Sequence, residues 1–182
     1  TTRTVESSGI TESGDFRIKT TAAAFQLLSS GLYSNKIRAV VRELSCNALD
    51  AHVSAGKDST PIEVKIPNRL DSQFYVKDQG PGLSHEQIMH MYTTYFDSTK
   101  QETNELIGGF GVGSKSPFSY TDSFSVESRH GGKRRLYTAF LSENGVPQIA
   151  LLGTSDMEPG EHTGLTVSMP VKPEDHNRFY EE

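Results

Sequence analysis

The hydrophobic and polar positions along the chain predict helices first and mainly strands later. Apolar residues at helical spacing predict a long helix over residues 36–55, with Ser34 or Asn35 as its cap and Gly56 at its end. Helix formers and the same spacing predict helices over residues 22–30 and from 85 to about 96. Runs of strand-forming residues, some with strict alternation, predict strands over residues 16–19, 62–66, 73–77, 123–129, 134–141, 147–152 and 164–169.

This order of elements predicts an α+β fold. Leading helices and a closing strand meander are typical of helices packed on one face of a sheet, so we expect a two-layer sandwich with a mixed, mostly antiparallel sheet. Residues 1–15 show little periodicity and are expected to form a flexible arm or an edge strand. Residues 16–182 are expected to form one domain, for which a chain of 182 residues has sufficient length.

Composition limits the binding partners and the cellular compartment that we expect for the protein. A formal net charge of -5 argues against general nucleic-acid binding, which requires a basic surface. The compact basic cluster 133–135 follows a Gly-Gly pair and is interpreted as a solvated turn, with an anion or partner contact as the alternative. Because the chain has one cysteine, Cys46, and no apolar run long enough to span a bilayer, we expect an intracellular protein without a transmembrane segment.

Three polar residues of the predicted long helix define its chemistry. Glu43, Asn47 and Asp50 stand at positions i, i+4 and i+7, so they share one helix face. Apolar residues flank this stripe, and two carboxylates and an amide are unfavourable to bury without a partner. The stripe is therefore a candidate site for a polar ligand.

Two glycine-containing segments complete the candidate chemistry. Residues 78–82, Asp-Gln-Gly-Pro-Gly, follow a predicted strand, where the carboxylate of Asp78 can accept a hydrogen bond from an amino group on a ligand that lies close to the glycines. Residues 107–116 are a glycine-rich run that opens a short helix, to about residue 120. The run is not a Walker A loop, because Ser114 stands where the lysine is required, and its spacing also excludes a Rossmann fingerprint. Each segment taken alone is also compatible with a structural turn.

Taken together and in this order, the three motifs resemble those of the GHKL ATPase superfamily, which holds the ATP-binding part of DNA gyrase, the Hsp90 chaperones, histidine kinases and MutL. Glu43, Asn47, Asp50 and Ala51 match its N box, and Asp78, Gly80 and Gly82 match its second motif. The third motif corresponds to Gly108, Gly109, Phe110, Gly111, Val112 and Gly113. The resemblance implies the Bergerat-type ATP-binding fold over roughly residues 20–170, with ATP and Mg²⁺ as cofactors.

The resemblance also implies a role for each matched residue. Asn47 would be the protein ligand of Mg²⁺, and Glu43 would act as the general base or orient the attacking water. Asp78 would bind adenine, whereas Asp50 would tether the loops on the adenine side. Further nucleotide contacts are expected from the three motifs, from Lys100 in a lid segment, and from Thr166. Leu165 stands where the family has a threonine, which predicts a drier or differently hydrated adenine pocket.

Residues 27–43 and 107–122 further resemble the N-terminal part of the rII A-type lysis-inhibition proteins of tailed phages. Those proteins are much longer, so we interpret the chain as the N-terminal part of a longer phage protein in the cytoplasm of a bacterial host, with peripheral attachment to the inner membrane as a further option. The expected function is slow ATP hydrolysis that drives closure of a lid over about residues 83–106, with a nucleotide-dependent homodimer or a protein partner. The alternative is an ATP-gated interaction module in which hydrolysis is incidental.

Overall fold

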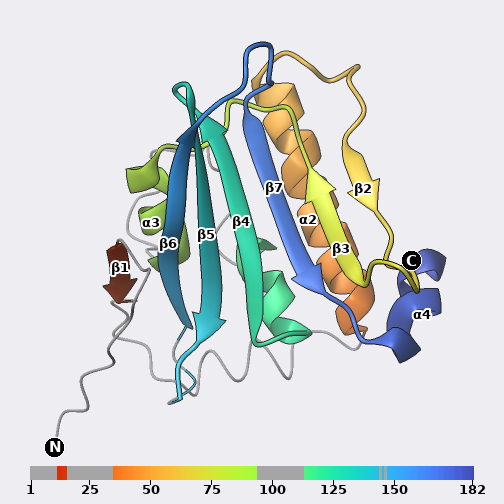
Figure 1. The fold of residues 1–182 in the computed structure, drawn as a ribbon. Helices are drawn as coiled ribbons and strands as arrows, with labels where there is room; N and C mark the ends of the chain where they lie inside the picture. Colours follow the sequence, from red (N-terminus) through yellow and green to blue (C-terminus); the bar gives the residue numbers. More distant parts are fainter. Residues whose placement is uncertain (1–11, 16–34, 94–112, 144, 146) are drawn as a thin grey trace, which may run out of the picture.

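A computed structural model describes residues 12–15, 35–93, 113–143, 145 and 147–182 of the chain. It forms two layers, in which helices cover one face of a twisted antiparallel sheet (Figure 1). The helices are α2 (Lys36–Ser54), α3 (His85–Thr93), α4 (His176–Glu181) and the 3₁₀ helices η1 (Gly113–Ser119) and η2 (Pro173–Asp175). The strands are β1 (Glu12–Asp15), β2 (Glu63–Lys65), β3 (Gln73–Lys77), β4 (Ser123–His130), β5 (Lys133–Leu141), β6 (Pro147–Asp156) and β7 (Gly164–Pro170).

The sheet has the strand order β1-β6-β5-β4-β7-β3-β2. Helices on one face of a sheet confirm the expected α+β sandwich. Every pair of described neighbouring strands is antiparallel, so the described strands do not form the mixed sheet that was expected. Strand β7 lies between β4 and β3, so that Val167 is paired with both Val126 and Val76. This register brings the end of β3, the start of β7 and the end of β4 together at one end of these neighbouring strands.

Helix α2 begins and ends close to the residues that the sequence predicted. The side chain of Asn35 accepts a hydrogen bond from the Arg38 N–H at 3.1 Å, which caps the first turn. Gly56 adopts a φ of +65°, which suits the turn that follows the helix. The face of α2 that packs on the sheet carries the buried residues Ile37, Val40, Leu44 and Ala48.

The core lies between α2, α3, η1 and the inner face of the sheet. From the sheet, Phe74, Val126, Ile149 and Met169 are fully buried, and they meet Val40 of α2 and Ile88 of α3 in one cluster. Alternate residues of each strand point to opposite faces, so these buried residues form the inner face of the sheet. Burial of these apolar side chains is the main force that holds α2 and α3 on the sheet.

Several predicted boundaries need adjustment. Strand β6 continues to Asp156, beyond the predicted end at residue 152, and η2 and α4 were not anticipated by the sequence analysis. Strand β1 lies at one edge of the sheet and pairs with β6. The predicted strand 16–19, the helix 22–30 and residues 94–106 of the expected lid lie outside the described residues. None of the helices in the described part of the chain has the length and apolar character that crossing a bilayer requires.

Candidate functional site

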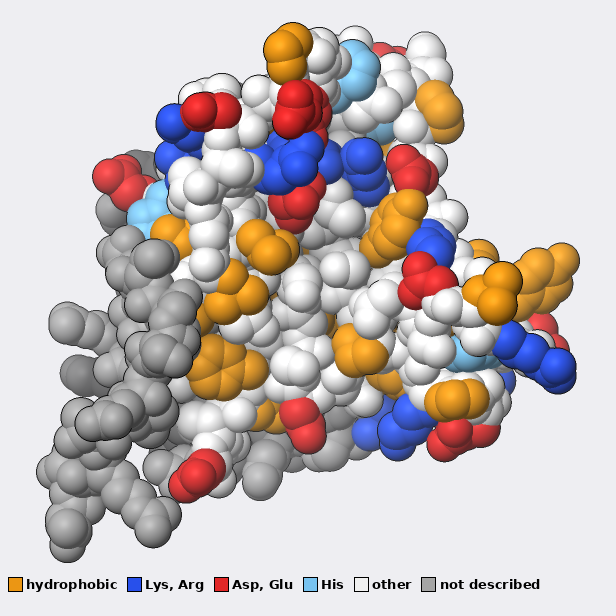
Figure 2. All heavy atoms as spheres, in the orientation of Figure 1, with side chains coloured by type: hydrophobic (Ala, Val, Ile, Leu, Met, Phe, Trp, Pro, Cys, Tyr) orange, Lys and Arg blue, Asp and Glu red, His pale blue; other side chains and the backbone are white. Residues whose placement is uncertain are grey.

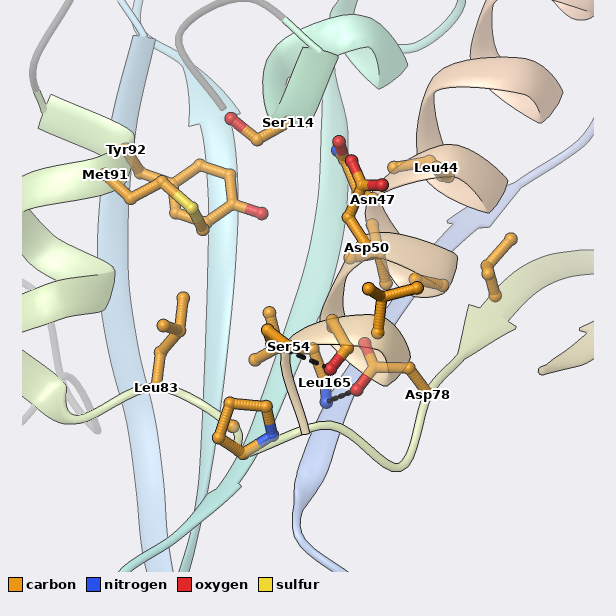
Figure 3. A pocket seen from close by; sticks show the side chains of 17 residues that line it. Leu44, Asn47, Asp50, Ser54, Asp78, Leu83, Met91, Tyr92, Ser114 and Leu165 are labelled. Carbon is orange, nitrogen blue, oxygen red and sulfur yellow. Dashed lines mark hydrogen bonds between the residues drawn. The ribbon is translucent and has the colours of Figure 1, made fainter. Parts of the chain in front are cut away.

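A pocket of about 400 Å³ lies between α2, α3, η1 and the β3–β7 part of the sheet. Figure 3 shows Asn47 of α2 and Ser114 of η1 at one end and Asp78 with Leu165 at the other, and Tyr92 of α3 closes one side. The wall between the two ends is largely apolar and includes Leu44, Val76, Leu83, Met91 and Val167. A long pocket with few polar side chains at its ends is typical of small-molecule sites.

The first end of the pocket joins the N-box helix to the end of the glycine-rich run. A Cβ atom on Gly113 would lie 2.7 Å from Oε2 of Glu43 and 3.6 Å from Nδ2 of Asn47, so only glycine fits here without displacing a side chain. The other carboxylate oxygen of Glu43, Oε1, accepts a hydrogen bond from Arg42 at 2.6 Å. Asn47 lines the pocket, whereas Glu43 adjoins it through its contact with Gly113.

Asp78 forms the second end of the pocket. Its Oδ1 accepts hydrogen bonds from the backbone N–H groups of Gly80, at 2.8 Å, and Leu165, at 3.1 Å. Its Oδ2 has no hydrogen-bond partner among the described residues and remains available to a donor in the pocket. Burial raises the pKa of Asp78 above its ordinary value, and the two backbone N–H groups oppose that shift.

The glycines of residues 78–82 allow close backbone packing. A Cβ atom on Gly80 would lie 2.7 Å from the Cβ of Ala51, so this turn packs directly on α2. Gly82 adopts a φ of +67°, and a Cβ there would lie 2.2 Å from the carbonyl oxygen of Arg129. The requirement for glycine at both positions is therefore steric and comes from elements distant in the sequence.

The buried guanidinium of Arg129 holds this turn from the side of β4. Its Nη2 donates to the Asp78 carbonyl at 3.0 Å, and its Nε donates to the His162 carbonyl at 3.1 Å. Its Nη1 donates to Glu127 and to the hydroxyl of Thr166. Sequence reasoning missed Arg129, because the two carbonyls that it binds lie 51 and 33 residues away and no local pattern marks a buried arginine.

Thr166 and Asp50 do not lie as the sequence analysis expected. Thr166 points away from the pocket toward Arg129, because Leu165 and Val167, its neighbours in β7, face the pocket instead. Asp50 lines the pocket and is exposed, and among the described residues it has no hydrogen bond that would tether the adenine-side loops. Lys100 and residues 108–112 lie outside the described residues.

Two buried residues of η1, Ser114 and Lys115, directly follow the third motif. Ser114, which distinguishes the run from a Walker A loop, lines the pocket next to Asn47 (Figure 3). Lys115 follows it and is 5% exposed, and burial lowers the pKa of its ammonium group to about 8. The sequence placed both residues in a short helix but did not indicate that η1 is buried along its whole length.

The basic cluster 133–135 lies among acidic side chains. Lys133 pairs with Asp156 at 2.5 Å, and Arg134 pairs with Glu161. Figure 2 shows lysine and arginine side chains next to aspartate and glutamate on this part of the sheet face. The cluster begins strand β5 and does not itself form the turn that the sequence had suggested, and its ion pairs are those of a solvated surface.

The fold and the site define a class of ATPase domain. The family model described as "Histidine kinase-, DNA gyrase B-, and HSP90-like ATPase" matches residues 33–158, which include α2, the turn 78–82 and η1. This chain belongs to that family. Its fold is that of an ATP-binding domain of this family.

The chain is also similar to bacterial chaperones of the Hsp90 type. It is 30% identical over 135 residues to the chaperone protein HtpG of Rickettsia typhi, which covers 62% of this chain and 21% of that protein. A second HtpG, from Rickettsia bellii, is 29% identical over 172 residues, which covers 82% of this chain and 27% of the relative. The chain therefore spans about a quarter or less of the length of these relatives.

Proposed function

We propose that this chain binds Mg-ATP in the pocket between α2, α3 and η1 and hydrolyses it slowly. The observation that carries the proposal is the meeting of the three motifs: Gly113 packs on Glu43 and Asn47 at one end of the pocket, and Asp78 forms its other end. These residues come from elements far apart in the sequence. Because they assemble around one pocket, we favour a nucleotide site and not three separate structural turns.

The residues present fit a nucleotide. A pocket of about 400 Å³ lies within the range of small-molecule sites, about 300 to 1,000 Å³. At the Asp78 end, a free carboxylate oxygen among apolar walls suits a flat base with an amino group, as in adenine. The phosphates would then extend toward Asn47 and Ser114.

At the Asn47 end, the side chains have distinct proposed roles. The oxygen of Asn47 is a neutral ligand for Mg²⁺, which would neutralise phosphate charge when bound. Glu43 would hold and deprotonate the attacking water through Oε2, since Arg42 occupies Oε1. The apolar wall would keep other water away from Glu43, the proposed general base.

We further propose that hydrolysis drives closure of residues 83–106 over the nucleotide and a conformational switch, with a nucleotide-dependent dimer or protein partner. The resemblance of residues 27–43 and 107–122 to rII A-type proteins supports a role in a lysis-inhibition-type phage protein. The alternative is an ATP-gated interaction module in which turnover is incidental.

Calorimetry and phosphate release test the proposal. We expect the wild type to bind ATP with Mg²⁺, and Glu43→Gln to retain binding while losing turnover, because glutamine keeps the shape but cannot accept the proton. Glu86→Gln, at an exposed position in α3, is the matched control and should behave as the wild type. Absence of ATP binding at millimolar concentration would contradict the proposal, and turnover by Glu43→Gln would exclude Glu43 as the base.

An assay of function in cells distinguishes a required hydrolysis cycle from a simple ATP-dependent switch. If Glu43→Gln binds ATP and still supports the cellular function of the full-length protein, hydrolysis is incidental and the gated module is correct. If the variant binds ATP and loses that function, the hydrolysis cycle is required.

A further inference from the structure

The backbone of the turn 78–82 is held by side chains from several elements. Arg129 donates to the Asp78 carbonyl at 3.0 Å, and the hydroxyl of Thr163 donates to the Gly80 carbonyl at 2.7 Å. Nδ1 of His130 lies 3.0 Å from the Pro81 carbonyl oxygen. The turn is therefore fixed through its main chain and through Oδ1 of Asp78, which leaves Oδ2 of Asp78 to bind a ligand.

Gln79 is the residue of this turn that is tied to α2 and the loop after it. Its N–H donates to Nε2 of His52 at 2.7 Å, and its carbonyl accepts from Nζ of Lys57 at 2.8 Å. His52 is 1% exposed, and its Nδ1 lies 2.8 Å from the carbonyl oxygen of Thr60. Because a backbone N–H only donates, Nε2 must carry the lone pair and Nδ1 must carry the hydrogen that is donated to Thr60.

We propose that His52 is a positioning residue for base recognition: it fixes Gln79, and through it the carboxylate of Asp78, relative to α2. This inference rests on the proposed function of the pocket. Asn47 and His52 stand on the same helix, so one rigid element sets both the phosphate end of the pocket and the position of the base-binding carboxylate. His52 takes the tethering role that the sequence analysis assigned to Asp50.

A plain structural role for His52 makes a different prediction. A buried histidine with both ring nitrogens hydrogen-bonded contributes to stability wherever it lies, and its loss would then weaken all binding in proportion to unfolding. A positioning role instead requires that only the bond to Gln79 matters for the base. The two ring nitrogens can be separated by substitution.

Two variants of His52 each preserve one of its hydrogen bonds. In His52→Gln the side-chain oxygen reaches the Nε2 position and can accept from Gln79, whereas in His52→Asn the amide nitrogen occupies the Nδ1 position and can donate to Thr60. We expect His52→Asn to weaken ATP and ADP by the same factor, about tenfold, as for the loss of one hydrogen bond. We expect the affinity of His52→Gln for ATP and ADP to stay within about threefold of that of the wild type. Mg-tripolyphosphate, which has no base, should bind the wild type and both variants with equal affinity.

Amide hydrogen exchange supplies a readout without nucleotide. Exchange at Gln79 and Gly80 should be faster in His52→Asn than in His52→Gln, at similar melting temperatures, because only the former releases the Gln79 N–H. His90→Asn, at an exposed position of α3, is the matched control and should change neither exchange nor binding. If His52→Asn does not fold, Lys57→Met removes the second contact with Gln79 from a partly exposed position and should weaken ATP and ADP but not tripolyphosphate.

Each outcome decides one point. Equal losses of ATP affinity in His52→Gln and His52→Asn, or a matching loss of tripolyphosphate binding, overturn the positioning role and leave a structural one. Failure of the wild type to bind ATP overturns the proposed function and, with it, base recognition. In that case the exchange rates at Gln79 still decide whether His52 holds the turn.

Discussion

The backbone of Gly113 packs so closely against the carboxylate of Glu43 that a Cβ atom on the glycine would lie 2.7 Å from Oε2. These two residues belong to different motifs of the sequence, and their contact fixes η1 against α2. The same added Cβ atom would lie within 4 Å of both Nδ2 and Oδ1 of Asn47. The contact therefore sets the position of η1 relative to both the proposed base and the proposed metal ligand.

We expect Gly113→Ala to reduce ATP turnover by about 100-fold, because the added methyl group must displace the flexible end of Glu43 by a substantial part of an ångström. ATP affinity should change much less, since Asp78 and the apolar walls are untouched. Phosphate release and calorimetry measure the two effects. Gly153→Ala is the matched control, because a Cβ at Gly153 meets nothing within 4 Å. Unchanged turnover in Gly113→Ala would contradict the proposed role of Glu43.

Asp78→Asn should weaken ATP binding while stabilising the fold at neutral pH. The asparagine oxygen can keep the bonds from Gly80 and Leu165, but its amide nitrogen then replaces the free carboxylate oxygen and cannot accept from an amino group. The affinity for ATP should fall by about tenfold or more.

The stability effect of Asp78→Asn follows from the sign of the pKa shift. Burial raises the pKa of Asp78 above its ordinary 3.8, so between these two pKa values the folded chain binds more protons than the unfolded chain and stability falls as the pH rises. Asparagine does not titrate. The melting temperature of Asp78→Asn should therefore exceed that of the wild type by more at pH 7 than at pH 4, and a larger difference at pH 4 would contradict the cause given for the shift.

Arg129→Met should destabilise the domain by about 3 kcal/mol, because it leaves buried carbonyls of Asp78 and His162 without their donor. Urea unfolding at pH 7 measures the change. Lys133→Met, which removes an exposed pair with Asp156, is the control and should leave the unfolding midpoint nearly unchanged. Equal effects in the two variants would mean that the buried contacts of Arg129 contribute no more than a surface pair.

Lys115→Met tests the burial of η1. Because burial lowers the pKa of Lys115 from 10.5 to about 8, the unfolded chain binds more protons than the folded chain between these values. This residue therefore makes the wild type more stable as the pH rises from about 8 to 10.5, and methionine removes that contribution. Urea unfolding at about pH 7 and about pH 10 should show that the free energy of unfolding of the wild type, relative to that of Lys115→Met, increases with pH. A constant difference would indicate that Lys115 is solvated.

Much of the fold was accessible from the sequence because its signals are local. The caps and apolar spacing of α2 and the run of strand-forming residues in β3 predicted both elements within a residue or two at each end. The helix 85–96 is confirmed as far as Thr93, beyond which the described residues stop. By contrast, η2 and α4 were missed.

The same local signals decided which residues to examine in the site. Helical periodicity alone put Glu43, Asn47 and Asp50 on one face of α2, and Ser114, at the position of the required lysine, separated the run 108–113 from a Walker A loop. Only the tertiary structure decided how these residues are used. It brought Gly113 to Glu43, turned Thr166 toward Arg129, and gave His52 both ring contacts. The physical reason is that steric fit and buried hydrogen bonds join residues across the sheet and the helix layer, where no repeat along the chain records them.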